Sequence, residues 1–261
     1  MLLRVLRADP AGNITLFVLD PVAPERRASL AAELMRKYPA WGIEQVGFAC
    51  PAEEDVDGHM EMMGGEFCGN ATRAYAMYTA RERGCGGTLR LRVSGCEHVV
   101  SAEVDLDGGT ARSEMPLPRS VRSAEVGGRC GTLVDLGGIA HFVVEGAEPS
   151  EEFFRAAEQV FADIPALDAC GVIFLDRATH RMTPLVKVVE PNTLVWEGSC
   201  GSGSVACAVA ESEALADGAF EQDYFQPAGT VRASVVRRAG HVVSAAIGGS
   251  VTLSEEMTAE V

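Results

Sequence analysis

Lysine is almost absent from this chain, whose 261 residues include only Lys37 and Lys187. Lys37 lies at the end of an expected helix, and Lys187 lies in the strand-like stretch Leu185–Val188 without a phosphate-binding loop beside it. Enzymes that use pyridoxal phosphate hold it through a lysine Schiff base. The sequence therefore argues against this cofactor, and we expect the protein to need none.

Other absences exclude further classes of protein. No apolar run reaches the roughly 18 residues of a membrane span, and the charged start Met1–Arg7 is typical of a strand and not of a signal peptide. A net charge of −15 argues against nucleic acid as a partner. The eight cysteines are irregularly spaced, with no Cys-x-x-Cys and no His-x-x-x-His pattern. This predicts reduced thiols in a cytoplasmic protein without a metal site.

Two similar stretches occur, one in each half of the chain. They run from Cys68 to Ala74 and from Cys200 to Ala206, and both read Cys-Gly-x-x-(Thr/Ser)-x-Ala before a run of helix formers. The start of a helix favours thiolate over thiol, and its unpaired N–H groups can hold a carboxylate. We therefore expect Cys68 and Cys200 to be functional. The other cysteines are expected to be small packed hydrophobes: Cys50, Cys85, Cys96, Cys130, Cys170 and Cys207.

The two halves also resemble each other outside these stretches. Ala11–Val18 aligns with Leu136–Val143, with Gly, Ile, Phe and Val in common. A repeat this long predicts two homologous domains related by a pseudo-twofold axis, residues 1–120 with Cys68 and residues 121–261 with Cys200. The axis would bring both cysteines into one cleft, where we expect the active site.

Each half shows the same order of expected elements. A strand-like segment is followed by a helix, by a second helix that starts at the cysteine, and by alternating strands. We expect helices over 24–38, 69–83, 149–162 and 201–216, with Gly84 and Gly218 ending the two cysteine helices. Turn-bounded strands with few βαβ units predict an α+β fold with mixed or antiparallel sheets. The acidic tail 254–261 is expected to fray.

Two thiols on opposite sides of one bound anion could exchange the Cα proton of an amino acid without a cofactor. One thiolate would remove the proton from one face, and the opposing thiol would donate a proton to the other. The helix dipoles would stabilise the negative charge that develops. The expected partner is therefore a small amino-acid substrate, and a homodimer is left open.

These motifs resemble those of the diaminopimelate epimerase-like superfamily of cofactor-independent racemases, over both halves of the chain. The resemblance implies two pseudo-symmetric domains, each with its sheet wrapped around a central helix. It implies Cys68 and Cys200 as the two catalytic bases. It also implies three sets of substrate-binding residues. Asn13 and Gln45 would line the cleft, and Glu190 would bind the α-amino group. The α-carboxylate would be bound by Gly69, Asn70, Gly201 and Ser202. Proline racemases have histidine after the first Cys-Gly, where this chain has asparagine.

The departures from the epimerase pattern concern the substrate. Glu190 is followed by Pro191 and Asn192 where the epimerases have an arginine, and Ile139-Ala140-His141 replaces their Asn-Pro-His. The stretch Met60–Thr72 is more similar to the histidine racemases of opine metallophore pathways. In those, a glutamate near the Gln45 position helps to hold the substrate, and Glu44 matches it, although a solvated loop carboxylate is an equal interpretation. The resemblance implies an isomerase, a histidine racemase first, with diaminopimelate epimerase or a non-catalytic relative that binds a small acid as alternatives.

Overall fold

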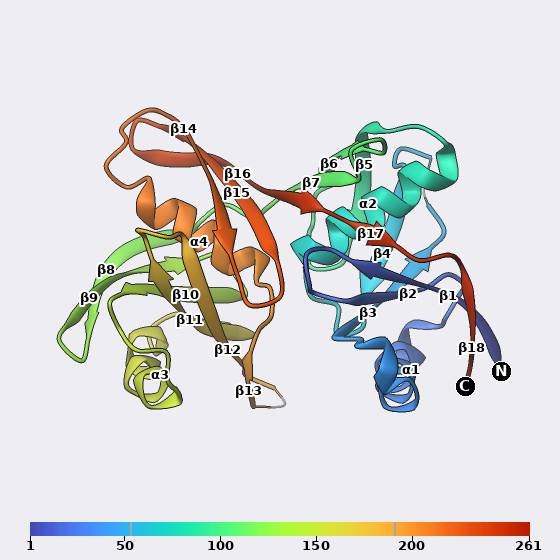
Figure 1. The fold of residues 1–261 in the computed structure, drawn as a ribbon, viewed down its shortest axis with the longest axis horizontal. Coiled ribbons are helices and arrows are strands. Elements are labelled where there is room, and N and C mark those ends of the chain that lie inside the picture. Colours follow the sequence, from blue (N-terminus) through green and yellow to red (C-terminus); the bar gives the residue numbers. More distant parts are fainter. Residues whose placement is uncertain (53, 191) are drawn as a thin grey trace. The chain divides into compact units, whose positions relative to one another are not determined.

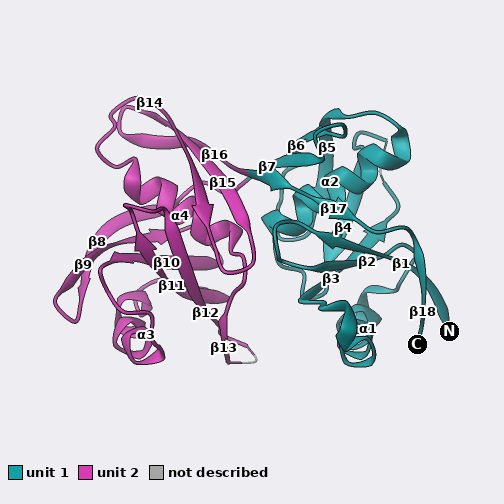
Figure 2. Ribbon diagram, viewed as in Figure 1, with its two compact units in different colours: residues 1–114, 248–261 teal, residues 115–247 magenta. Residues whose placement is uncertain are grey.

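The protein forms two compact units in a computed structural model that describes residues 1–52, 54–190 and 192–261. Unit 1 comprises residues 1–114 and 248–261, and unit 2 comprises residues 115–247 (Figure 2). The sequence predicted a boundary between residues 120 and 121, with the whole C-terminal part in the second domain. In the structure the C-terminal segment belongs to unit 1, because its strands pair with the first strand of the chain.

Unit 1 is built from strands and two α-helices (Figure 1). Its helical elements are α1 (Pro24–Lys37), the 3-10 turn η1 (Pro39–Trp41) and α2 (Gly69–Arg83). Its strands are β1 (Leu2–Asp9), β2 (Thr15–Val18), β3 (Gln45–Cys50), β4 (Gly58–Met62), β5 (Gly87–Val93), β6 (Val100–Asp105), β7 (Thr110–Glu114), β17 (Thr252–Leu253) and β18 (Met257–Glu260).

Unit 2 has a similar order of elements, with one more strand before each of its two α-helices. Its helical elements are α3 (Glu151–Ala157), the 3-10 turn η2 (Glu158–Phe161) and α4 (Gly201–Glu211). Its strands are β8 (Ser120–Val126), β9 (Arg129–Asp135), β10 (Ile139–Glu145), β11 (Ala169–Asp176), β12 (Arg181–Val188), β13 (Thr193–Trp196), β14 (Gly218–Phe225), β15 (Thr230–Arg238) and β16 (His241–Ser250), whose last three residues are assigned to unit 1.

The strand pairings confirm a mixed sheet and repeat from one unit to the other. In unit 1, β1/β2 is antiparallel, β2/β3 parallel, β3/β4 antiparallel, β4/β5 parallel and β5/β6 antiparallel. In unit 2, β9/β10 is antiparallel, β10/β11 parallel, β11/β12 antiparallel, β12/β14 parallel and β14/β15 antiparallel. The sequence repeat therefore corresponds to a repeat of sheet topology within an α+β fold.

Each unit encloses one of the cysteine helices. α2 is buried along nearly its whole length and contributes Ala71, Ala74 and Ala76 to a core formed with the strands of unit 1. α4 is buried in the same way from Gly201 to Ala210. A helix that is buried on all sides needs small side chains where strands approach it closely, and alanine supplies them without loss of helix propensity.

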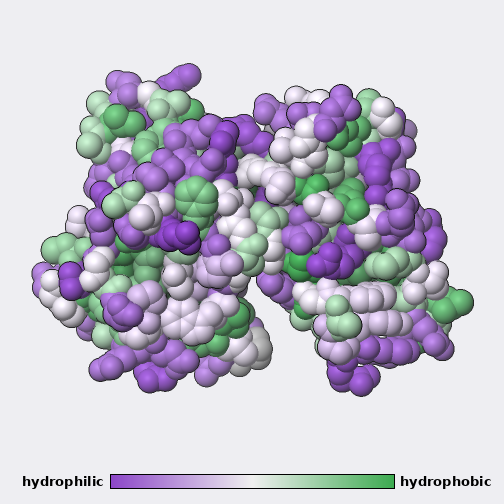
Figure 3. All heavy atoms as spheres, in the orientation of Figure 1, coloured by the Kyte–Doolittle hydropathy of each residue, from purple (hydrophilic) through white to green (hydrophobic). Residues whose placement is uncertain are grey.

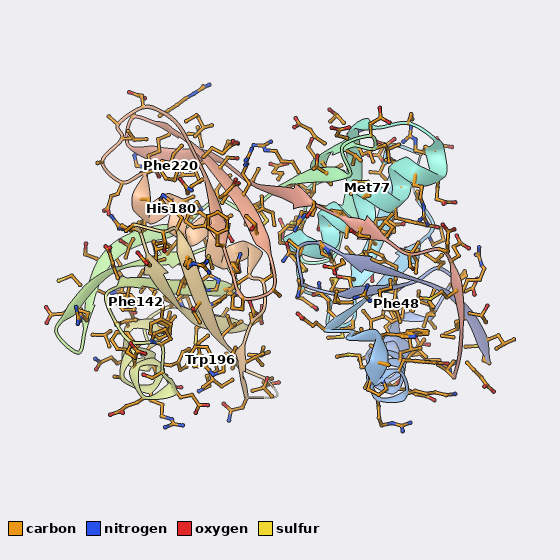
Figure 4. The ribbon with its side chains drawn as sticks, viewed as in Figure 1. Phe48, Met77, Phe142, His180, Trp196 and Phe220 are labelled. Atoms are coloured by element: carbon orange, nitrogen blue, oxygen red, sulfur yellow. The ribbon has the colours of Figure 1, made fainter. Side chains whose placement is uncertain are left out.

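The other helix of each unit packs on a separate core. Leu30 and Leu34 of α1 lie in a cluster with Phe48 of β3, and Phe154 of α3 lies in a cluster with Phe142 of β10. Figure 4 shows Phe48 and Phe142 on the sheets of their units. In unit 1 the strands pack against α1 and the buried α2, and in unit 2 they pack against α3 and the buried α4. This packing fixes each cysteine helix firmly within its unit.

The helix ends show where local sequence signals were sufficient. α2 runs over 69–83 as expected and ends at Gly84, whose φ of 68° is a left-handed conformation that glycine adopts without strain. α4 is shorter than expected and ends at Ser212, well before Gly218. The reason is the buried Arg237, which donates hydrogen bonds to the Val209 carbonyl and the Ser212 hydroxyl. This side chain satisfies the end of α4 from a distant strand.

The structure corrects two further expectations, one about the helix 149–162 and one about the C-terminal tail. The helix expected over 149–162 is divided into α3 and the 3-10 turn η2. The tail does not fray, because β18 pairs with Leu2–Val5 of β1 and buries Ala259.

Hydrophilic side chains cover much of the visible face of each unit (Figure 3). Among the described residues, no helix combines the length and the apolar composition needed to cross a membrane.

Candidate active site

Cys68 is the residue that caps the N-terminus of α2. Its extended backbone (φ −130°, ψ 110°) lets Sγ accept a hydrogen bond from the Ala71 N–H at 3.4 Å. The Thr72 hydroxyl donates to the Cys68 carbonyl at 2.8 Å. The threonine of the motif therefore fixes the cysteine backbone, while the first N–H groups of α2 have no carbonyl acceptor within the helix. This group of residues, with Asn13, Glu44, Gln45 and Asn70, is called the Cys68 half-site.

Hydrogen bonds join three predicted binding residues to Cys68. The Gln45 side-chain amide donates to Asn13 Oδ1 at 2.7 Å, and Asn13 Nδ2 donates to Glu44 Oε2 at 2.9 Å. Cys68 Sγ lies 4.0 Å from Asn13 Oδ1. Partial burial raises the pKa of Glu44, although the Asn13 hydrogen bond acts in the opposite direction. Unit 1 therefore gathers an amide pair, a carboxyl group and a thiol around one helix start.

Arg73 connects this half-site to the rest of unit 1. Its guanidinium is fully buried and donates to Asn70 Oδ1, to the Pro10 carbonyl and to the Ser250 carbonyl. Burial lowers its pKa to about 10, so it stays charged at neutral pH. Arg73 thus holds α2, the loop before Asn13 and the end of β16 together.

Cys200 repeats the same geometry at the start of α4. Its backbone (φ −117°, ψ 108°) lets Sγ accept from the Gly203 N–H at 3.3 Å, and the Ser204 hydroxyl donates to the Cys200 carbonyl at 2.7 Å. A Cβ at position 203 would lie 2.7 Å from Ile173 Cδ1 and 3.1 Å from Cys200 Sγ. Glycine is therefore required at position 203 for packing beside the thiol.

Side chains from α4 itself and from other segments of unit 2 surround Cys200. Ser202 Oγ lies 3.6 Å from Cys200 Sγ and 2.8 Å from Nε2 of His141 on β10. The Cys200 N–H donates to Gln226 Oε1 at 2.6 Å. His141 is fully buried, and burial lowers its pKa to about 3, so its ring is neutral at physiological pH. These residues, together with Glu197, are called the Cys200 half-site.

The protonation of both thiols differs from the sequence-based expectation. The helix starts were expected to favour thiolate, but burial raises the pKa of Cys68 and raises that of Cys200 well above its ordinary value. The N–H groups of Ala71 and Gly203 act in the opposite direction and are outweighed. Both groups are therefore thiols in the protein without substrate, and Cys68, which is only half-buried, is the easier one to deprotonate.

Glu197 is the residue at this site that sequence reasoning missed. After burial, the interaction with its carboxylate is the main cause of the raised Cys200 pKa. The predicted Glu190 is exposed in the turn between β12 and β13, and β13 extends for about 10 Å between that turn and Glu197. Pro191, which follows it, lies outside the described residues. The only local signal for Glu197 was an acidic residue three positions before the cysteine.

The surroundings of Lys187 show how well this lysine could form a Schiff base with pyridoxal phosphate. Lys187 Nζ lies 2.5 Å from Glu158 Oε1, and this hydrogen bond raises the lysine pKa. A charged, paired amine is a poor Schiff-base nucleophile. What the two half-sites offer instead is a pair of thiols at helix starts, each with N–H groups that suit a carboxylate.

Comparisons with known proteins found similar sequences and a similar fold. The family model described as the histidine racemase CntK N-terminal domain matches residues 3–259. A histidine racemase of Fusobacterium nucleatum is 32% identical over 215 residues, 78% of each chain, and one of Staphylococcus aureus is 26% identical over 241 residues, 85% of each chain. Among solved structures, a predicted epimerase from Pseudomonas aeruginosa covers 99% of both chains with a TM-score of 0.69 and 14% identity, which supports the fold.

Proposed function

Since the chain belongs to the histidine racemase family defined by the CntK N-terminal domain, we propose that it is an isomerase that racemises histidine without a cofactor. The observation that carries the proposal is the duplicated capping geometry, in which Cys68 and Cys200 have matching backbone angles and matching hydrogen bonds at the starts of two buried helices. The proposal requires both cysteines to reach one bound amino acid.

The chemistry is an exchange of the Cα proton. The thiolate of one cysteine removes this proton and becomes a thiol, while the thiol of the other donates a proton to the opposite face and becomes a thiolate. No net proton is gained or lost, and the reverse reaction starts from the protonation state that the forward reaction leaves. N–H groups of Gly69 and Gly201 at the helix starts hold the carboxylate and stabilise charge as it spreads from Cα.

Binding of the substrate prepares the thiols for this exchange. The α-ammonium group of an amino acid brings a positive charge that favours the thiolate form and offsets the effect of burial. Cys68 supplies the thiolate more readily, because its pKa is less raised than that of Cys200. Glu197 raises the Cys200 pKa, so it helps to keep Cys200 in the thiol form that donates a proton to Cα.

The Cys68 half-site supports histidine as the substrate. Glu44, held by Asn13, offers a carboxyl group to an imidazole N–H. A second carboxylate on the substrate, as in diaminopimelate, would meet the Glu44 carboxylate and lose part of its hydration without gaining a cationic partner. The site therefore favours a neutral or weakly basic side chain.

The two-cysteine mechanism is tested by Cys68→Ser and Cys200→Ser, with the exposed Cys85→Ser as the control. Each catalytic variant should lose racemisation of L-histidine by at least about 1,000-fold, since a hydroxyl is a far weaker acid and base here than a thiol. Deuterium incorporation at Cα in D₂O should fall with it. Near-normal turnover in either variant contradicts the mechanism, and no exchange by the unmodified protein would indicate a relative that only binds a small acid.

The substrate is tested by kcat/KM for L-histidine beside LL-diaminopimelate. We expect histidine to be preferred, and Glu44→Ala to raise the KM for histidine more than it lowers kcat. Glu44→Gln keeps a hydrogen-bonding group and should have a smaller effect. A clear preference for diaminopimelate would refute the assignment of histidine and would leave the two-cysteine mechanism intact.

A further inference from the structure

A second cluster of reactive side chains lies in unit 1 on the antiparallel pair β3 and β4. Cys50 is directly opposite His59 in the strand register, and Glu61 lies two residues beyond His59, on the same face of the pair. Cys50 Sγ, a ring nitrogen of His59 and a carboxylate oxygen of Glu61 all lie within 4.8 Å of one another. Thiol, imidazole and carboxylate are the three groups that bind Zn²⁺ in proteins.

The distances are close to those of a tetrahedral site. With a Zn–S bond of about 2.3 Å and a Zn–N bond of about 2.0 Å, neighbouring ligand atoms stand roughly 3.3–3.6 Å apart. His59 Nε2 and Glu61 Oε1 are already 3.3 Å apart. All three side chains are partly buried, and Cys50 Sγ lies no more than 4.8 Å from the other two ligand atoms, so metal binding would draw Sγ closer to them.

The orientation of His59 supports a cation at this position. Its Nδ1 lies 3.4 Å from the Pro51 carbonyl oxygen, which can only accept a hydrogen bond. Ligand histidines commonly donate their second ring N–H to a carbonyl in this way. With the proton on Nδ1, the lone pair of Nε2 faces an oxygen of Glu61, and that contact is favourable only when a proton or a cation lies between the two atoms.

Arg27 of α1 already supplies positive charge at the cluster. Its guanidinium donates to Glu61 and, at 3.4 Å, to Cys50 Sγ, and it lies over the Phe48 ring. A guanidinium carries one positive charge, whereas a Cys50 thiolate and a Glu61 carboxylate together carry two negative charges. A dication would neutralise both ligands, and Arg27 would give up its two contacts with them.

We propose that Cys50, His59 and Glu61 form a binding site for a borderline-soft divalent transition-metal ion, with Zn²⁺ as the best fit and water as the fourth ligand. Bound metal fastens β3 to β4 at the end of the pair that is remote from Gln45, so it stabilises unit 1 and takes no part in the proton exchange.

The site is tested with Co²⁺ alone, in the reduced full-length protein and without histidine, which would itself bind the metal. A thiolate–cobalt charge-transfer band in the near ultraviolet and the visible bands of tetrahedral cobalt should rise to one equivalent. Zn²⁺ should abolish both, and saturating Zn²⁺ should raise the unfolding temperature.

Variants locate the metal. Cys50→Ser should remove the charge-transfer band, and His59→Gln should weaken Co²⁺ binding by about 100-fold or more, because it removes a direct ligand. Arg27→Met should strengthen binding by up to about fivefold, because the part-exposed ion pair no longer has to be broken. The exposed Cys85→Ser is the matched thiol control and should bind as the unmodified protein does.

Two results would overturn the proposal. One is the absence of a thiolate–cobalt band in the unmodified protein at saturating Co²⁺. The other is a band that survives in both Cys50→Ser and His59→Gln, which would place the metal on other thiols, with the catalytic cysteines the first to examine. These readouts do not depend on racemase activity, so the metal site and the proposed function can fail separately.

Discussion

Replacing Gly171 with alanine tests how His141 is held beside the Cys200 half-site. Gly171 is opposite His141 in the parallel pair β10/β11. A Cβ at this position would lie 2.6 Å from His141 Nδ1 and 3.0 Å from Cε1. The imidazole is fully buried, so it can move away only by giving up its 2.8 Å hydrogen bond with Ser202.

The cost of this change can be worked out from its two parts. Overpacking of a filled core destabilises by about 1–3 kcal/mol, and a buried ring nitrogen left without its partner costs about 1–3 kcal/mol more. A total of about 4 kcal/mol should lower the thermal unfolding midpoint by roughly 8–16 °C in a protein of this size. Since Ser202 also lies beside Cys200, kcat for racemisation should fall.

Gly248→Ala is the matched control, because it adds the same methyl group to a strand where the nearest atom would be 3.4 Å away. Differential scanning calorimetry and racemisation kinetics should show a large effect at position 171 and a small one at position 248. In a His141→Ala background, the added cost of Gly171→Ala should nearly disappear. Equal costs at the two glycines, or an undiminished cost without the imidazole, would refute this reasoning.

Three further predictions follow from the buried polar groups. The pKa of His141 is about 3 in the folded protein and 6.5 ordinarily, so between these pH values only the unfolded state binds a proton. The free energy of unfolding should therefore fall as the pH is lowered from 6.5 to 3, by up to about 1.4 kcal/mol per pH unit. Denaturant unfolding of His141→Gln should lack this contribution. Glu197→Gln removes a carboxylate that raises the Cys200 pKa, so the ultraviolet titration of that thiolate should move to lower pH; an unchanged titration would contradict the contact. Arg73→Met removes three hydrogen bonds, two of them buried, and should cost about 3 kcal/mol or more. Arg81→Met, which removes one part-buried bond, should lower the unfolding midpoint far less.

The parts of the fold that sequence alone predicted depend on local signals. α2 was predicted at both ends because its capping cysteine, its alanine-rich run and Gly84 are adjacent along the chain. The order of elements in each half followed from the repeat, and the shared strand pairings confirm it. The cysteine motifs likewise predicted the capping geometry, since each motif contains the residues that make its hydrogen bonds.

The parts that were missed depend on contacts between distant segments. Arg237 ends α4 from a strand about two dozen residues later, so no signal near Ser212 announces the stop. The raised pKa of Cys200 results from burial, which a local motif does not report. The proposed metal site could not be predicted locally either, because it combines Cys50 of one strand with a His-x-Glu pair of the next, and only the strand register brings them together.

The return of β17 and β18 to unit 1 affects the order in which the protein can fold as it is synthesised. Unit 2 is one continuous segment, whereas unit 1 needs residues from both ends of the sequence. Leu3 and Val5 of β1 are buried in one cluster with Ala259, so this part of the core cannot close until the C-terminal residues have been translated. A ribosome adding about 5–20 residues per second leaves β1 without β18 for more than ten seconds. Unit 2 can therefore complete its core before unit 1, although unit 1 is started first.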